Sequence, residues 1–282
     1  MSGACKIDNV DMGELGVLIP RGGDAQLLLF PRRSRPLTND WFEHDGLDVD
    51  WSSLRWSPKQ VDLEFYLSAP DKTAFNNRLS AVEALLYSPG NRTVELGALG
   101  VTTSLQFTDI TKLDTRGGLH RSGAKSALFT ARFMDNTPTV LFSGTALRSG
   151  GRIPTRVLLG GLDFSEYGII IHEVYNTALR IRPPKKGLSI EVGGQHGAIV
   201  DTSFTPKRST DVINIECSML LPKTDFWPSY RALFADLDAD GPLVLELANG
   251  RQINCYFEEM SGIKRHRSER VFIEFTLKFI VL

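Results

Sequence analysis

The chain has 282 residues, enough for two domains of about 140 residues that each bury a core of their own. Its 32 basic and 33 acidic residues nearly cancel, which excludes the basic excess typical of a dedicated nucleic-acid binder. We expect no membrane span, because no window of about 18 residues is continuously apolar, and the first residues lack the apolar core of a signal peptide. Three scattered cysteines, Cys5, Cys217 and Cys255, are too few for a disulfide framework and indicate a reducing compartment.

One unit occurs twice in the chain: a strand, a proline, a helix, a glycine and a second strand. The first occurrence spans 61–96 and the second spans 213–247. Their prolines, Pro70 and Pro222, are 152 residues apart. An internal repeat of this kind decides the fold, because each copy is expected to form the same structural unit.

The repeat extends well beyond this unit. Val10–Gly16 and Leu162–Gly168 share Asp, Glu and Gly in place at the offset of 152 residues. Near its end each copy has a His-Arg-Ser triplet, starting at His120 or His266, and a final strand begins nine residues after the histidine. We therefore expect a first domain at 1–134, a bridging arm or linker at 135–156 and a second domain at 157–282.

Periodicity predicts the same fold class for both copies. Residues 61–67 and 213–219 alternate between apolar and polar, as in strands buried on one face. Apolar residues recur every three or four positions over 71–88 and 225–238, as in amphipathic helices. We predict a mainly β (α+β-like) chain of two tandem β-sandwich or barrel domains, each with one packed α-helix.

The start of each predicted helix has a candidate cap. Asp71 suits the N-cap of the first helix. In the second helix Thr224 or Asp225 would cap, which would place Pro228 in the first turn, where its missing N–H is tolerated.

No stretch predicts a catalytic, cofactor-binding or metal site. The nearest approach to a phosphate-binding loop is Gly118–Ser126, but Ala124 separates Gly123 from Lys125 and the segment leads into a strand rather than a helix. A G-x-S-x-G nucleophile motif is absent. The histidines lack His or Cys partners at metal-ligand spacing; they are His44, His120, His172, His196 and His266. We expect no enzymatic activity, no cofactor and no metal.

The first copy holds an aromatic cluster that the second lacks. It consists of Trp41, Phe42, Trp51 and Trp56. Three interpretations are open: the side chains are core, they fill a protein interface, or they stack on sugars. The three tryptophans are therefore candidate interface residues.

Two predicted loops, 108–125 and 258–270, are rich in basic residues. They are either solvated hairpin tips or contacts with an acidic neighbour or a phosphate backbone. The candidate interface residues in them are Arg116, Arg121, Lys125, Lys264, Arg265, Arg267 and Arg270.

Part of the second copy resembles a known family. Val192–Asp201, with its Gly-rich turn, the basic Pro206–Arg208 and the alternating strand Val212–Met219 resemble the N-terminal domain of phage distal tail proteins. The wider class is the tail-tube fold of tail-tube, distal tail and baseplate hub proteins. Two such domains in one chain are similar to the myophage baseplate hub protein, in which three subunits supply six tube domains. Typical distal tail proteins differ, because they carry one tube domain and an unrelated C-terminal domain.

The resemblance implies a mechanical role in the tail tip of a phage or phage-like particle. Tube domains join edge to edge in a ring that continues the tail tube, which implies a homo-oligomer, either a trimer with pseudo-sixfold symmetry or a hexamer. The implied partners are other tail proteins (tail tube, hub and tip proteins), with DNA only passing through the lumen. The implied location is the virion tail, after assembly in the host cytoplasm. The strands at 61–67 and 213–219 are candidates for the continuous sheet of the ring.

A second function is compatible with the same residues. A tandem β-sandwich carbohydrate-binding module would use Trp41, Trp51 and Trp56 as its sugar-stacking surface. The near-neutral charge of the chain agrees with a conduit that does not hold DNA tightly, but it does not exclude this alternative.

Overall fold

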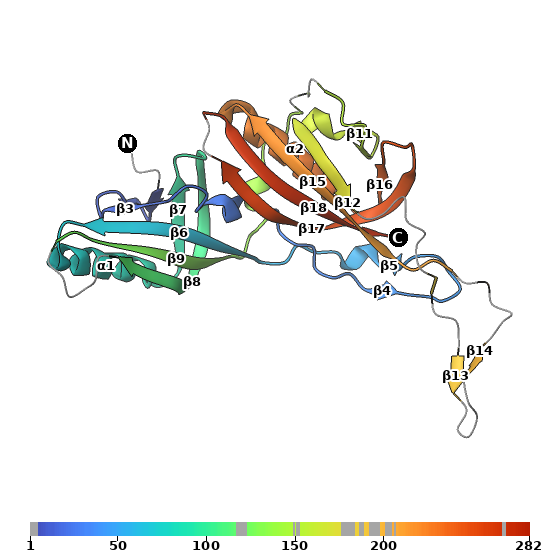
Figure 1. Cartoon of the computed structure of the whole chain (residues 1–282), viewed down its shortest axis with the longest axis horizontal. Helices are drawn as coiled ribbons and strands as arrows, with labels where there is room; N and C mark the ends of the chain where they lie inside the picture. Colours follow the sequence, from blue (N-terminus) through green and yellow to red (C-terminus); the bar gives the residue numbers. More distant parts are fainter. Residues whose placement is uncertain are drawn as a thin grey trace.

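The structure, a computed structural model, describes residues 5–116, 123–148, 150, 153–175, 184–185, 189–191, 198–200, 205, 207–266 and 269–282. Two seven-stranded antiparallel sheets carry the fold (Figure 1). The first has the order β2 (Val10–Asp11), β1 (Cys5–Ile7), β7 (Asn91–Leu96), β8 (Val101–Arg116), β9 (Lys125–Asp135), β6 (Lys59–Ala69) and β3 (Val17–Leu18).

The second sheet repeats this order strand by strand. It consists of β11 (Leu162–Asp163), β10 (Leu158–Leu159), β16 (Leu243–Glu246), β17 (Gln252–His266), β18 (Val271–Val281), β15 (Asp211–Leu221) and β12 (Ile169–Tyr175). Each sheet has one helix, α1 (Lys72–Leu86) or α2 (Lys223–Leu237), which follows β6 or β15 directly. The predicted fold class, mainly β with two tandem units and one helix in each, is confirmed.

Two short hairpins and four 3-10 turns complete the fold. The hairpins are β4 (Thr38–Asn39) with β5 (Asp48–Val49), and β13 (Ser189–Glu191) with β14 (Ala198–Val200). The turns are η1 (Ala25–Leu28), η2 (Trp51–Ser53), η3 (Val140–Phe142) and η4 (Phe164–Tyr167).

The central strands are those that the alternation predicts. β6 pairs with β9 over eleven residues, from Lys59 opposite Asp135 to Ala69 opposite Lys125, and β15 pairs with β18 over eleven. The apolar residues of β6 all point to the buried face, and Phe65 is stacked on Phe129 at 5.3 Å between ring centroids. Because side chains alternate along a strand, the same register turns Lys59, Lys125 and Asp135 inward at the ends of the pair.

The two helices differ at their N-termini. Asp71 caps α1 as predicted, its carboxylate accepting a hydrogen bond from the Ala74 N–H at 2.8 Å. The predicted cap of α2 at Thr224 or Asp225 is wrong, because this helix begins at Lys223 after Pro222 and has no side-chain cap. Pro228 therefore lies inside α2 rather than in its first turn.

The repeated motif near the start of each copy forms the turn before an edge strand. Gly16 and Gly168 have φ angles of 70° and 73°, the left-handed region that favours glycine. A Cβ at Gly16 would lie 2.6 Å from the Ser68 carbonyl oxygen, so this turn also needs the missing side chain.

The two basic segments predicted as loops are largely strand. β8 continues to Arg116 and β17 to His266, each paired with the following strand. Both long strands are interrupted twice by register shifts, the first of them after Phe107 in β8 and after Phe257 in β17. These bulges break the period-2 pattern by which a strand is identified in a sequence.

Part of the segment between the sheets packs against the second copy. Within it, Leu141 and Phe142 of η3 are buried, and the Leu147 N–H donates to the Pro228 carbonyl oxygen at 3.1 Å. The first sheet ends at Asp135 and the second begins at Leu158. The division into domains at 1–134 and 157–282 remains a prediction.

Candidate assembly interface

An extended segment of the first copy lies on the second sheet. This first arm, residues 31–58, contains β4, β5 and η2 and ends at the start of β6. Its Arg33 N–H donates to the Glu258 carbonyl oxygen of β17 at 2.9 Å. The Arg32 guanidinium pairs with the Glu258 carboxylate at 2.8 Å. Backbone and charge contacts thus join the arm of one copy to a central strand of the other.

A buried arginine anchors the middle of this junction. The Arg33 guanidinium donates to the Leu237 carbonyl oxygen and pairs with the Asp238 carboxylate, both at 3.1 Å. It lies 3.9 Å from the centre of the Trp56 ring. Burial lowers the pKa of Arg33, while Asp238 opposes the shift. A desolvated charge with this many partners fixes the position of the arm rather than adding much net stability.

The three candidate tryptophans have different surroundings. Trp56 donates from Nε1 to Asp238 Oδ1 at 2.7 Å, and its ring lies 5.0 Å from Phe234. Trp51 meets Tyr256 edge-on at 6.3 Å. Trp41 is 53% exposed. Two of the three, Trp51 and Trp56, therefore contribute to an interface within the chain, whereas the Trp41 side chain is exposed.

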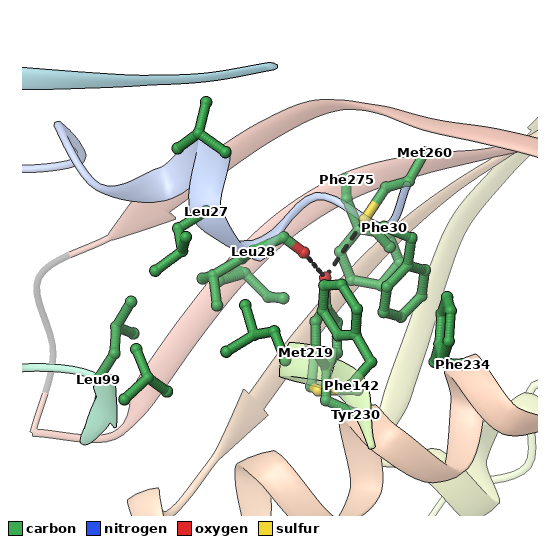
Figure 2. Close-up of a cluster of buried hydrophobic side chains, with 14 of the residues drawn as sticks. Leu27, Leu28, Phe30, Leu99, Phe142, Met219, Tyr230, Phe234, Met260 and Phe275 are labelled. Carbon is green, nitrogen blue, oxygen red and sulfur yellow. Dashed lines mark hydrogen bonds between the residues drawn. The ribbon is translucent and has the colours of Figure 1, made fainter. Parts of the chain in front are cut away.

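A cluster of buried aromatic and aliphatic side chains lies at the centre of the junction (Figure 2). The Tyr230 hydroxyl of α2 donates to the Leu28 carbonyl oxygen of η1 at 2.5 Å and contacts Met260 Sδ at 3.3 Å. Phe30, just before the first arm, lies 4.6 Å from the Tyr230 ring, and Phe142 of η3 packs on both. First copy, connecting segment and second copy thus share one core.

Replacing Trp56 by alanine tests whether this junction contributes to stability. We expect a loss of about 2 kcal/mol in the free energy of unfolding, because the half-buried ring and its hydrogen bond to Asp238 are both removed. Trp41→Ala is the matched control, with an expected change within about 0.5 kcal/mol. Urea unfolding measures the free energy of unfolding of both variants. Equal effects of the two substitutions would contradict the role of Trp56 in the junction.

The predicted basic residues do not form one surface in the described part of the chain. Arg121 and Arg267 lie outside the described residues, and Arg116 ends β8. Lys125, predicted in a loop, is buried at the start of β9. Arg265 pairs with the buried Asp24 of the first copy, whereas Lys264 and Arg270 are exposed.

The free edges of the sheets are formed by strands other than β6 and β15, the candidates for the continuous sheet of a ring. β6 and β15 have a neighbouring strand on both sides, so they are not the edges of their sheets. The edge strands β3 and β12 expose Leu18 and Ile170, 52% and 56% accessible, at positions that are equivalent in the repeat. A short edge strand with an exposed apolar residue is a candidate for contact with another chain. The apolar runs Val17–Ile19 and Ile169–Ile171 predict both strands, but their positions at the sheet edges do not follow from the sequence.

Neither a metal-binding cluster nor a membrane-spanning helix is present among the described residues. In that part of the chain, no three His, Cys, Asp or Glu side chains are grouped so that they could hold a metal ion. None of the described helices is long and apolar enough to cross a membrane. The phosphate-loop-like Gly118–Ser126 lies partly outside the described residues, and its Lys125 is the first residue of β9.

No known family profile matches the chain, and a search of curated proteins gave no match. Among solved structures, the chain is similar to the crystal structure of the SPP1 Dit (gp 19.1) protein, described as a paradigm of the hub adsorption apparatus in phages that infect Gram-positive hosts. The likeness covers 98% of this chain and 97% of that chain, with 9% sequence identity and a TM-score of 0.34.

Proposed function

We propose that this chain is a structural component of a phage or phage-like tail tip and assembles into a ring that continues the tail tube. The observation that carries the proposal is the pair of seven-stranded sheets with the same strand order. One chain then supplies two similar units, as the resemblance to tail-tube domains implies. The exposed apolar residues on the edge strands β3 and β12 support contact with further chains.

The junction supports a mechanical role. Tyr230, Arg33 and Trp56 of this junction join the two units by hydrogen bonds and an ion pair, so we propose that each chain acts as one fixed pair of units. A ring of such pairs has twice as many units as chains. We further propose that the repeat reflects an internal duplication, with domains at 1–134 and 157–282. The ring would contact other tail proteins in the virion and let DNA pass through its lumen.

The mass of the purified full-length chain in solution tests this proposal. Three chains of 31.3 kDa weigh about 94 kDa and six weigh about 188 kDa. Light scattering over a range of protein concentrations is expected to approach one of these masses. A mass of 31.3 kDa at every concentration, together with no ring particles in the presence of co-expressed tail proteins, would contradict it.

A further inference from the structure

A cavity of about 650 Å³ lies between the first arm and the second sheet. The arm contributes Arg35, Pro36 and Leu47 to its wall, and the sheet contributes Tyr256 of β17 and Ile280 of β18. A volume of this size is typical of pockets that bind ligands. The two sides of the wall come from different copies of the repeat, so the cavity exists only where the arm is in place.

The sheet side of the wall carries a buried hydroxyl group without a protein partner. Tyr256 lies directly opposite Ile280 in the β17–β18 register, so both side chains lie on the same face of the sheet. Tyr256 is only 8% exposed, and its ring is held edge-on against Trp51. Its hydroxyl makes no hydrogen bond with any described residue. A polar group buried to this extent requires a hydrogen-bond partner, which a ligand in the cavity can supply.

The arm side of the wall carries a cation without a counterion. Arg35 is exposed, and its guanidinium makes no hydrogen bond or ion pair with the described residues. Burial raises the pKa of Tyr256, and the positive charge of Arg35 is among the charges that oppose this shift. The guanidinium and the phenol hydroxyl are therefore close enough to act on one ligand, and both can donate to it.

The other charged groups of the wall already have partners. Arg32 pairs with Glu258 at 2.8 Å, the Asp40 carboxylate pairs with the Lys185 ammonium at 2.5 Å, and Arg33 is paired as described above. One positive charge is thus left uncompensated, which favours an anionic ligand. The two carboxylates of the wall would repel a doubly charged anion such as phosphate more strongly than a singly charged carboxylate.

The apolar part of the wall indicates what carries the carboxylate. Pro36, Leu47 and Ile280 offer an apolar surface beside the two donors. A glutamate side chain combines an aliphatic stem with a carboxylate, which a guanidinium binds through two parallel hydrogen bonds. Arg35 and Asp40 are exposed, so the cavity opens at the surface, where a segment of another protein can enter.

The buried hydroxyl belongs to the second copy alone. Phe257 and Phe107 precede the equivalent bulges of β17 and β8, so the position of Tyr256 is taken by Gln106 in the first copy. The side-chain oxygen of Gln106 is not free, because it accepts from the Asn136 amide at 3.0 Å. We therefore expect one such site in each chain.

We propose that this cavity binds a glutamate side chain on an acidic, extended segment of another protein. Arg35 pairs with the glutamate carboxylate, and the Tyr256 hydroxyl donates to the same group. The proposal does not depend on the ring, because the whole site is built within one chain. A ligand bound between the arm and the sheet also stabilises the junction, since it binds only the folded chain.

Titration calorimetry of the full-length chain with synthetic peptides tests the site. The peptide acetyl-Ser-Leu-Glu-Ser-amide is expected to bind at one site per chain with a Kd below about 1 mM. The same peptide with glutamine in place of glutamate should bind at least about tenfold more weakly, because it lacks the charge. Equal binding of the two peptides, or no binding of either at millimolar concentrations, would overturn the proposal.

Three variants assign the binding to the cavity. Arg35→Gln should weaken binding of the glutamate peptide at least about tenfold, and Tyr256→Phe by about three- to tenfold. Both should fold normally, because Arg35 is exposed and phenylalanine keeps the ring beside Trp51. Arg21→Gln, at an exposed arginine outside the cavity, is the matched control and should bind as the wild type does.

Two further ligands separate the proposed occupant from other anions. Inorganic phosphate and free glutarate are titrated under the same conditions, and both are expected to bind more weakly than the glutamate peptide. Tighter binding of phosphate would point to a phosphate site, and tighter binding of glutarate to a site for small free acids. Either result would contradict the proposal, as would wild-type affinity of the Arg35→Gln variant.

Discussion

Tyr230→Ala is expected to lower the free energy of unfolding by about 4 kcal/mol. The side chain is fully buried at the centre of the shared core, where it contacts Phe30 of the first copy and Phe226 of its own helix. Removing it leaves a cavity and also leaves the Leu28 carbonyl oxygen without its donor. Burial raises the pKa of Tyr230 well above its ordinary value, so the hydroxyl remains a donor over the whole working range of pH.

Tyr230→Phe separates the hydrogen bond from the packing. It keeps the ring and leaves the Leu28 carbonyl oxygen unpaired, so we expect a loss of about 1–2 kcal/mol. Tyr87→Phe is the matched control, because Tyr87 is 65% exposed and its hydroxyl is free to bind water. Chemical denaturation followed by tryptophan fluorescence measures all three. If Tyr230→Ala lowers the free energy of unfolding no more than Tyr87→Phe does, the two copies do not share a core.

Lys59→Met is expected to destabilise the chain by about 3 kcal/mol at neutral pH. The buried ammonium donates to the Leu27 and Leu29 carbonyl oxygens at 2.8 and 2.9 Å and lies directly opposite Asp135 in the β6–β9 register. Methionine keeps the volume but leaves two carbonyl oxygens and a carboxylate without this partner. Lys264→Met, at an exposed lysine, should change stability by less than about 0.5 kcal/mol.

The same lysine is expected to make the stability of the chain depend on pH. Burial lowers the pKa of Lys59 to about 8, and the negative charge of Asp135 only partly opposes the shift. The folded state therefore loses this proton at a lower pH than the unfolded chain does. Above about pH 8 the unfolded chain binds more protons at Lys59 than the folded chain does. The contribution of Lys59 to stability therefore rises with pH until about 10.5, the ordinary pKa of lysine. A neutral amine still has the two hydrogens that its two carbonyl partners need.

The measurement is the difference in unfolding free energy between the wild type and Lys59→Met at several pH values. It is expected to widen in favour of the wild type by about 2 kcal/mol between about pH 7 and pH 10. The buried tyrosines and cysteines titrate in both proteins, so their effects cancel in the difference. A difference that stays constant or narrows over this range would contradict the assigned environment of Lys59.

The central elements of the fold could be predicted from the sequence because their patterns are long and regular. The alternation at 61–67 and 213–219 identifies β6 and β15, and the helical spacing identifies α1 and α2 within two residues of their starts. The offset of 152 residues predicts that corresponding strands exist in both copies. The strand order that they share in space follows from none of these patterns, because long-range pairing leaves no local periodicity.

The errors have physical causes that can be named. The bulges after Phe107 and Phe257 hide the outer parts of β8 and β17, which therefore looked like basic loops. Pro228 suggested a late helix start, yet α2 accommodates it in its interior, where its carbonyl oxygen accepts from Leu147. Lys125 looked like a surface residue, but the strand register turns it inward.

The candidate site was only partly predictable. The tryptophans could be identified in the sequence as a cluster that only the first copy has. Their surroundings depend on Phe234, Tyr256 and Asp238, which lie about 180 residues or more further along the chain. The roles of Arg33 and Tyr230 in the junction could not be predicted, because their partners Leu237 and Leu28 lie 204 and 202 residues away in the chain.

Electron microscopy of the purified full-length chain, with its mass measured in the same sample, tests the central claim most directly. That claim is that each chain contributes two similar units in fixed positions to a closed ring. The expected result is a ring with rotational symmetry whose density lobes number twice the chains given by the measured mass. Rings with one lobe per chain, or particles without rotational symmetry at the mass of an assembled oligomer, would contradict it.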